Sequence, residues 1–316
     1  DPYLVAAKNG LFWIQDAYVK SRWYPHAATY DGIHNYIRNG VKIIVDAYNG
    51  TIDYYIAEPG DPLTRAYSRI YPTLFKPLDE MPEELRKHVR YPKDIFQIQM
   101  QIYHKYHQTR PETFYQEEDM WAFAQQTKDE IRDIGTQSMR AYYLTLNLIE
   151  KDKQEFLLLS PMSPANRPNL RALAIAGCDG EHYGKFYIYS FPKVEQVYGP
   201  AQISALIDQD TTIAEQFTLW DQVGSEVQRG RMIILPIAGM VFYIQPVYLS
   251  ASTDLKIPQL QRLIVSQGDV VAMEVSLQKA FERLEEKLKE RQRRMPEKGA
   301  DRNGVETPVS ETPGPE

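Results

Sequence analysis

The stretch Asn35–Ile56, NYIRNGVKIIVDAYNGTIDYYI, contains the strongest local structural signal of the chain. Two runs rich in β-branched and aromatic residues flank Asn49-Gly50, the dipeptide that best supplies the two positive φ angles of a type I′ turn. The pattern predicts a β-hairpin with a two-residue loop. Tyr48 then pairs with Thr51.

This pairing divides the hairpin into two faces, because successive strand residues point to opposite sides. One face is apolar and predicts burial; it comprises Ile43, Val45, Ala47, Ile52, Tyr54 and Ile56. The other sets Asp46 directly across from Asp53, and like charges in that position destabilise a strand pair. A bound cation or a shared proton would relieve the pair. So would a nearby Lys42 or Arg38, or exposure of both carboxylates to water.

Composition bounds the class of protein. The 316 residues are 43% hydrophobic and 25% charged, as in an ordinary globular protein of one large or two average domains. A net charge of −6 argues against nucleic acid as a partner. Cys178 is the single cysteine, which excludes an intrachain disulfide and leaves it either a nucleophile or a plain small residue. The start DPYLVAAKNG, without Met, predicts a fragment of a longer protein.

The first half combines hairpins with helices. Asn9-Gly10 predicts a second hairpin over 3–19. Helix starts at Asp61-Pro62, at Pro82 and at Asp94 predict a helical insertion from Asp61 to Ala124. The apolar stripe predicted for the third helix is Ile95, Ile98, Ile102, Tyr103 and Tyr106. His104 and His107 share a face of that helix and either ligate a metal with a third residue or are two partly exposed histidines.

The second half predicts further hairpins. One spans 141–160 around the turn EKDKQ, and a helix is predicted from Asn169 to Ala176, before a strand that begins near Gly184. Asp179, Glu181 and His182 form a candidate polar cluster, but because they stand beside two glycines they are interpreted as a turn. Two short helices, two hairpins at Ala238-Gly239 and Gly268-Asp269, and a charged helix beginning near Ser276 complete this half.

These patterns predict an α+β fold, with antiparallel hairpins forming one or two mixed sheets around the helical insertion. The predicted division is 1–130 for hairpins plus insertion and 131–292 for a second α+β part packed on the first. Residues 293–316 are rich in Pro, Glu and Gly and predict a disordered tail.

Several strings of the chain resemble uncharacterised protein family 0182, a group of bacterial multi-pass membrane proteins. They include NYIRNGVKIIVDAYNGT, MPEELRKHVRYPKDIF, SPANRPNLRALAIAGCDGEHYGK and TLWDQVGSEVQRG, and the resemblance runs from Asp16 to Leu284. The resemblance implies a parent protein with a block of about seven transmembrane helices followed by a large region. This chain is similar to the large region only. The resemblance implies a place in the bacterial cell membrane, with this region on the extracytoplasmic side. It implies no catalytic residue and no cofactor.

Two functions from different classes remain. The first is a non-catalytic module that binds an envelope polymer, a lipid or a protein partner and is coupled to its own N-terminal transmembrane block. No triad, zinc signature, P-loop or GxGxxG motif is present in the sequence, which favours this reading. The predicted ligand-binding residues are Tyr36, Arg38, Asp46 and Tyr48, which lie in the best-matched string.

The alternative is an envelope-processing hydrolase that uses paired carboxylates as acid and base. Its candidate residues are Asp46, Asp53, Glu118 and Asp119. A short likeness of VDAYNGT to domains of the PepSY kind gives a third reading, which predicts a helix packed across the apolar face of the hairpin.

Overall fold

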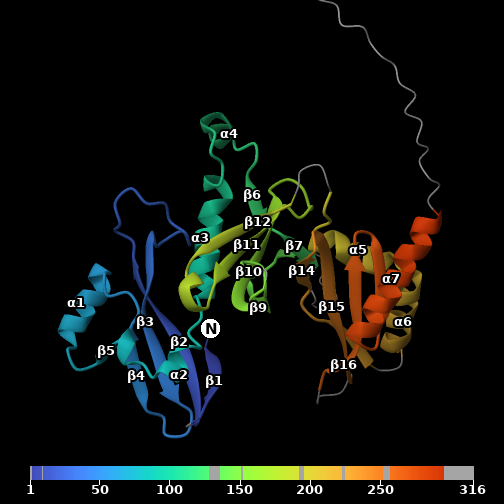
Figure 1. Cartoon of the computed structure of the whole chain (residues 1–316). Coiled ribbons are helices and arrows are strands. Elements are labelled where there is room, and N and C mark those ends of the chain that lie inside the picture. The colour runs from blue at the N-terminus through green and yellow to red at the C-terminus, as the bar shows by residue number, and fades with distance from the viewer. Residues whose placement is uncertain are drawn as a thin grey trace, which may run out of the picture.

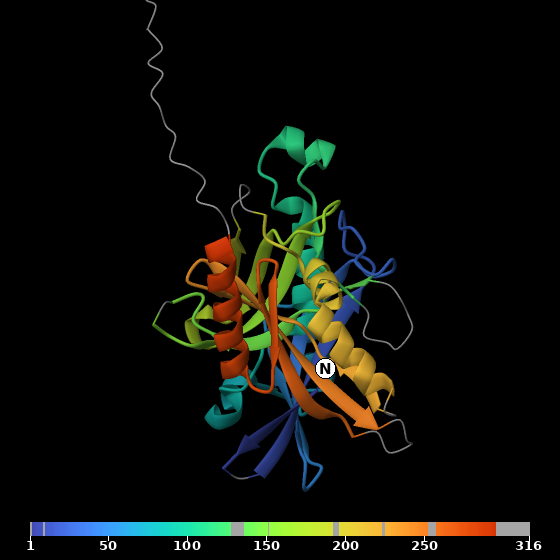
Figure 2. The same ribbon diagram turned by 90° about the vertical axis from the view of Figure 1, so that its right-hand side faces the viewer.

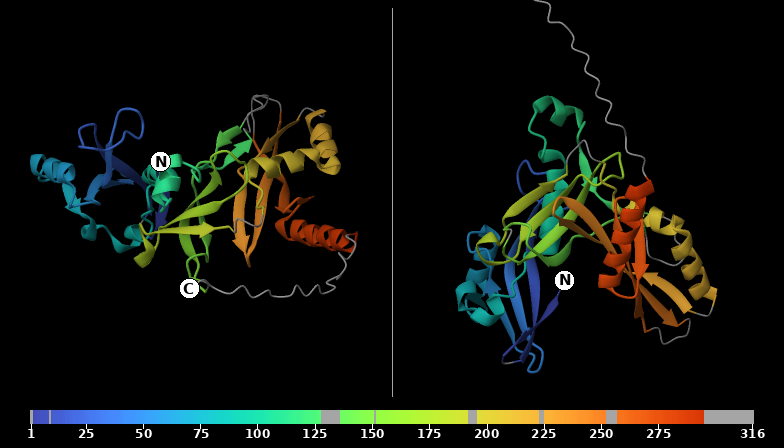
Figure 3. Two further views of the ribbon diagram at one scale, coloured as in Figure 1. Left: turned by 90° about the horizontal axis from the view of Figure 1, so that it is seen from above. Right: turned by 45° about the vertical axis from the view of Figure 1, so that its right-hand side comes forward.

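The computed structural model describes residues 2–8, 10–127, 136–150, 152–191, 196–222, 225–251 and 257–294. These residues form three five-stranded sheets and a two-stranded ribbon, with helices between and around them. Seen from above, the three sheets follow one another along the molecule in chain order (Figure 3). The α+β class is confirmed, with more sheets than the one or two expected.

The N-terminal sheet contains the hairpin predicted around Asn49-Gly50. Its strands are β1 Tyr3–Ala7, β2 Gly10–Ser21, β3 Tyr36–Asp46, β4 Ile52–Ile56 and β5 Phe75–Pro77. They lie in chain order (Figure 1), and all neighbours are antiparallel except β4 and β5. The β1–β2 pair turns one residue earlier than expected, since Ala7 pairs with Gly10, and Asn9 lies outside the described residues.

The β3–β4 turn is longer than predicted. Asp46 accepts hydrogen bonds from the backbone amides of Tyr48 (2.8 Å) and Asn49 (2.9 Å), and its own amide donates to the carbonyl of Thr51 (3.0 Å). A side chain that binds the backbone two and three residues ahead favours a wider turn. Val45 therefore pairs with Ile52, and the predicted pairing of Asp46 with Asp53 is wrong.

The buried face of this hairpin is also the opposite of the predicted one. Ile44 and Tyr55 are buried, whereas Ile52 is 49% exposed. The buried face carries Lys42, whose counter-charge is Asp16 on β2 rather than the acidic pair of the hairpin. The core on this face also includes Tyr3, Val5, Ile14, Met81 and Leu85.

The insertion contains α1 Pro62–Ile70, the 3₁₀ turn η1 Leu78–Glu80, α2 Glu83–Arg86, α3 Lys93–Tyr106 and α4 Pro111–Gln116. Asp61 caps α1 by accepting from the Thr64 amide at 2.6 Å, as predicted. The predicted cap of α3 is wrong, because the helix starts after Pro92 and Asp94 lies in its first turn. Its predicted stripe is wrong as well: Phe96, Met100 and His104 are the buried positions, while Ile102 and Tyr106 are exposed. Leu85 of α2 packs on the Ile44 face of the sheet rather than on the face that the PepSY reading requires.

The middle sheet is covered on both sides. Its strands are β6 Trp121–Phe123, β9 Tyr142–Leu146, β10 Glu155–Pro164, β11 Ala172–Gly177 and β12 Phe186–Ser190. The ribbon of β7 Gln125–Thr127 and β8 Thr136–Ser138 lies beside it. Along β10, Leu158 packs with Phe96 of α3, whereas Leu157 and Leu159 pack in a second core that reaches the third sheet. Strands buried on both faces have continuous apolar sequences.

The helix predicted for Asn169–Ala176 is wrong, because Ala172–Gly177 form the strand β11. Every residue of β11 is buried. A short apolar run of this kind does not distinguish a buried strand from a buried helix by periodicity. The adjacent β9–β10 hairpin and the strand β12 were predicted correctly.

The third sheet has helices on both faces. It comprises β13 Ser225–Arg229, β14 Ile233–Ile237, β15 Met240–Ala251, β16 Gln259–Gln267 and β17 Val270–Glu274. Figure 2 shows α7 (Leu277–Arg294) on one side and α5 (Pro200–Gln209) with α6 (Thr211–Gln222) on the other. Successive residues of a strand point to opposite faces of the sheet, which explains this arrangement. On β16, Val265 packs with α7, whereas Ile264 packs in the core that the third sheet shares with the middle sheet.

The hairpins at Ala238-Gly239 and Gly268-Asp269, the two helices α5 and α6, and the terminal helix are all confirmed. The predicted boundary near residue 130 falls on 128–135, which lies outside the described residues. The predicted tail of 293–316 starts too early, because 293 and 294 still belong to α7; its remainder, 295–316, lies outside the described residues. In the described part of the chain, no helix has the length and apolarity needed to cross a membrane.

Candidate functional site

The connection from β11 to β12 brings a histidine to the edge of the middle sheet. It contains the 3₁₀ turn η2 (Gly180–His182), and its backbone is held at both ends. The amide of Gly184 donates to the carbonyl of Gly177 at 3.0 Å, and the amide of Gly177 donates to the carbonyl of Lys185 at 3.1 Å. The Asp179 carboxylate accepts from the Phe156 amide of β10 at 2.7 Å. The sequence interpretation of this segment as a turn is therefore correct, and the turn is fixed to the sheet.

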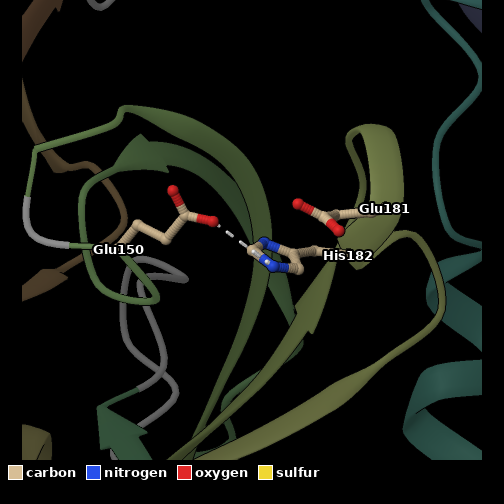
Figure 4. Close-up of side chains that lie close together, drawn as sticks. All are labelled: Glu150, Glu181 and His182. Atoms are coloured by element: carbon tan, nitrogen blue, oxygen red, sulfur yellow. Dashed lines mark ion pairs between the residues drawn. The ribbon is translucent and has the colours of Figure 1, made fainter.

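His182 contacts a carboxylate on each side of its ring. Its Nδ1 lies 2.9 Å from Oε1 of Glu155, the first residue of β10, and both residues are buried. Its Nε2 lies 3.6 Å from Oε1 of Glu150, on the turn between β9 and β10. Glu181 is the third carboxylate beside the ring (Figure 4). Ligand atoms of Glu150, Glu181 and His182 all lie within 4.8 Å of one another.

Lys153 supplies the positive charge of this cluster. Its Nζ lies 3.2 Å from Oε1 of Glu155. The hydrogen bond to Glu155 and the charges of Glu155, Glu150 and Glu181 raise the pKa of Lys153. Burial tends to raise the pKa of Glu155, but the hydrogen bonds from His182 and Lys153 hold it below its ordinary value. Glu155 is thus an ionised, buried carboxylate.

A polar cavity of about 680 Å³ lies at the opposite end of β10, where the chain crosses to β11. Residues from this crossing and from the segment after α4 line it, among them Glu118, Asp119, Asn166, Arg167, Asn169 and Arg171. Arg171 donates from Nη1 to the carbonyl of Phe191 at 2.7 Å. Its Nε is buried and has no hydrogen-bond partner among the described residues. Native proteins seldom leave a buried donor unsatisfied without a reason.

Two of the four predicted ligand-binding residues lie together. Tyr36 and Arg38 line a shallow hollow of about 460 Å³ at the start of β3, with Glu58 and Asp61. The Tyr36 hydroxyl donates to Asp61, and the Arg38 guanidinium lies 4.9 Å from the centre of the Tyr36 ring. Burial, and then the hydrogen bond to Asp61, raise the pKa of Tyr36 to about 12.

Asp46 and Tyr48 lie at the far end of the same strand. Eight residue steps of about 3.3 Å separate Arg38 from Asp46, so roughly 26 Å lies between the two pairs. Tyr48 is 76% exposed, and the carboxylate of Asp46 is engaged in its own turn. Hydrogen bonds from the amides of Asn49 and Tyr48 lower the pKa of Asp46. The four residues therefore do not form one site.

The remaining candidates from the sequence do not form one site either. Asp53 pairs with Lys76 at 2.6 Å, apart from Asp46. Glu118 and Asp119 both line the polar cavity. His104 packs edge-on against Phe123, and His107 stacks on Trp121 with ring centroids 3.9 Å apart, so both histidines belong to the packing of α3 on β6.

Cys178 is 3% exposed and lines a second cavity, of about 590 Å³, with Lys42 and Tyr183. Burial raises the pKa of its thiol to about 11. A buried thiol that keeps its proton is a poor nucleophile. Of the two readings of Cys178, the structure favours the plain small residue.

Sequence reasoning did not bring the His182 cluster together. Glu150 and Glu155 are part of the predicted turn EKDKQ and its flank, some 30 positions before His182. In the structure, Leu157 at the start of β10 pairs with Gly177 at the end of β11, so the turn before β10 meets the turn after β11. Predicting β11 as a strand would have revealed this convergence. The helix predicted in its place concealed it.

Fold and site define a multi-sheet α+β protein with a polar cavity and a histidine–carboxylate cluster at opposite ends of one buried strand pair. The sequence model of the uncharacterised protein family UPF0182 matches residues 1–220, and the chain belongs to this family. A UPF0182 protein of Syntrophobacter fumaroxidans is 58% identical over 292 residues, and one of Nitrosococcus oceani is 51% identical over 300.

These alignments cover 92% and 91% of this chain but 33% and 34% of the two relatives. A UPF0182 protein of Synechococcus sp. (strain JA-3-3Ab) is 47% identical, with 34% of its length covered. The chain thus spans about a third of the length of these curated relatives. No solved structure matches it.

Proposed function

We propose that this chain is the extracytoplasmic region of a bacterial multi-pass membrane protein and that it binds a polar component of the cell envelope without catalysing a reaction. The family resemblance supports the membrane setting, because it leads us to expect a block of transmembrane helices before this region. The share of the relatives that the chain spans leaves room for such a block. Its first partner is then its own transmembrane block.

The unpaired Nε of Arg171 is the observation that favours binding. Arg171 lines the cavity, and an unsatisfied N–H donor gains free energy when an acceptor from a ligand reaches it. The cavity is lined by guanidinium, carboxylate and amide groups, which suit a ligand that both donates and accepts hydrogen bonds. Envelope polymers carry many hydroxyl, amide and carboxylate groups, so they match this lining better than a lipid tail does.

Co-sedimentation with insoluble envelope polymer tests the binding. Arg167 is exposed at the cavity and is suitable for substitution, whereas Arg171 also holds the carbonyl of Phe191. Losing one charge-assisted hydrogen bond costs about 1.5–3 kcal/mol, so Arg167→Ala should weaken binding about tenfold to a hundredfold. Arg65→Ala removes the same charge from the exposed face of α1 and serves as the control. Equal binding by both variants, or no co-sedimentation of the unmodified chain, would contradict the proposal.

Labelling of the full-length protein in intact cells tests the membrane side. Tyr115 is 88% exposed on α4, and Cys178 is buried, so Tyr115→Cys introduces the one readily accessible thiol of the described residues. A membrane-impermeant maleimide should label this variant in intact cells to a greater extent than the unmodified protein. Labelling that requires cell lysis would place the region in the cytoplasm and refute this part of the proposal.

The hydrolase alternative now depends on Glu118 and Asp119, because these two carboxylates share the polar cavity. Asp46 and Asp53 do not support it, since each is engaged with other groups. Release of soluble fragments from the sedimented polymer, abolished by Glu118→Gln, would favour hydrolysis over simple binding.

A further inference from the structure

The His182 cluster has the composition of a metal site rather than of an ordinary surface ion pair. Three side chains with metal-ligating atoms converge from two turns, as Figure 4 shows. Glu150 and Glu181 are exposed, whereas His182 is only 9% exposed. Exposed carboxylates next to a buried imidazole leave an open path for an ion from solvent.

The orientation of the imidazole is fixed before any ion arrives. Glu155 accepts from Nδ1 of His182, with the two carboxylate oxygens at 2.9 Å and 3.0 Å. This contact turns Nε2 toward Glu150 and Glu181. Nε2 lies 3.6 Å from the Glu150 oxygen, which is beyond hydrogen-bonding distance. Histidines that bind metals usually donate their other ring nitrogen to a carboxylate in this way.

The charges of the cluster leave a deficit that a divalent cation would remove. Glu150, Glu155 and Glu181 are opposed by the ammonium group of Lys153. The three carboxylates outnumber the ammonium by two. Glu155 has Lys153 as its counter-ion, so the two carboxylates left over are those of Glu150 and Glu181.

We propose that Nε2 of His182 and carboxylate oxygens of Glu150 and Glu181 bind one divalent transition-metal ion of the zinc class. One nitrogen and two oxygen ligands suit zinc and its neighbours, and an imidazole ligand disfavours calcium and magnesium. Bonds of about 2.1 Å in tetrahedral geometry place ligand atoms about 3.4 Å apart. The present spacing is within 4.8 Å, so rotation of the two exposed glutamates closes the site. Water would occupy the remaining position.

Calorimetric titration of the metal-free chain with Zn²⁺ tests the site, and the visible spectrum of added Co²⁺ reports its coordination. One equivalent of each metal should bind. Glu150→Gln and Glu181→Gln should each weaken Zn²⁺ binding at least tenfold and change the Co²⁺ spectrum, while Ca²⁺ should not compete. These side chains are exposed, so neither variant is expected to unfold the chain.

Glu112→Gln provides the matched control, because it removes one exposed carboxylate from α4, away from the cluster. It should bind Zn²⁺ as the unmodified chain does. Glu155→Gln leaves the three ligands intact but disturbs the orientation of His182, and loss of such a contact costs about 10–100-fold in metal affinity. A circular dichroism spectrum verifies that this buried substitution has left the fold intact.

Zinc affinity that is the same in the unmodified chain, Glu150→Gln and Glu181→Gln would overturn the proposal, as would the absence of stoichiometric binding. The cluster would then serve only as a network of polar contacts around His182. This result would leave the proposed polymer binding untouched, because the polar cavity lies at the other end of β10.

Discussion

His104 makes the stability of the chain depend on pH in a way that can be calculated. It lies on α3 with 9% of its surface exposed, edge-on to Phe123 at 4.4 Å between ring centroids. Its Nε2 is buried and has no hydrogen-bond partner among the described residues. Burial, assisted by the charge of His107, lowers the pKa of His104 to about 4 from 6.5.

The direction of the effect follows from the two states. The folded chain keeps His104 neutral down to about pH 4, whereas the unfolded chain binds a proton below pH 6.5. Stability that is present above pH 6.5 is therefore lost as the pH falls toward 4. Each pKa unit is about 1.4 kcal/mol, so the loss is about 2 kcal/mol at pH 5 and about 3 kcal/mol at pH 4.

Urea unfolding of the unmodified chain and of His104→Leu, each at pH 7 and pH 5, measures this quantity. The free energy of unfolding should fall by about 2 kcal/mol more in the unmodified chain than in the variant. Comparing the two differences removes the contributions of all other titrating groups. His88→Leu replaces an exposed histidine and should behave as the unmodified chain does. If His104→Leu loses as much stability between the two pH values as the unmodified chain, the reasoning is wrong.

Three further predictions concern the core and a turn. Lys42→Met leaves the buried carboxylate of Asp16 without its counter-ion and should lower the free energy of unfolding by about 3–5 kcal/mol. The double variant Lys42→Met/Asp16→Leu should regain most of this free energy in urea unfolding, and a double variant as unstable as Lys42→Met would contradict the prediction. The Cys178 thiol, with its pKa raised to about 11, should resist maleimide at pH 8 until urea unfolds the chain, and rapid labelling of the native protein would contradict its burial. Gly239 has φ of +80° in the β14–β15 turn, so Gly239→Ala should lower the free energy of unfolding by about 1 kcal/mol and reduce the melting temperature. An unchanged melting temperature would contradict this prediction.

Local signals were sufficient where the decisive contacts are local. The Asp61 cap and the Ala238-Gly239 turn depend on a few neighbouring residues, and both form as predicted. Asn49-Gly50 carried an equally strong signal, yet the Asp46 side chain competed for the backbone amides of the turn and widened it. The sequence contained that competitor, but its effect depends on geometry rather than on residue type.

Non-local pairing decided the rest. Lys42 is buried because Asp16 of the neighbouring strand lies beside it, and no pattern within β3 reveals this partner. Likewise, α3 buries Phe96 and Met100 rather than Ile102 because the middle sheet covers that side. The predicted binding residues were chosen from one strand, so they were distributed along its length instead of converging.

Both candidate sites depend on the strand pair β10–β11, of which β11 was predicted as a helix. Glu155 begins β10 next to the His182 cluster, and Pro164 ends it at the polar cavity, nine residue steps or about 30 Å away. Because β10 and β11 are buried on both faces, they form a rigid support, and the turns at their two ends vary without disturbing its packing. Substitutions at one end should then leave the other unaffected, since independent sites at this separation contribute additively. A metal at one end and a polymer at the other are thus compatible in a single chain, each held by the same central sheet.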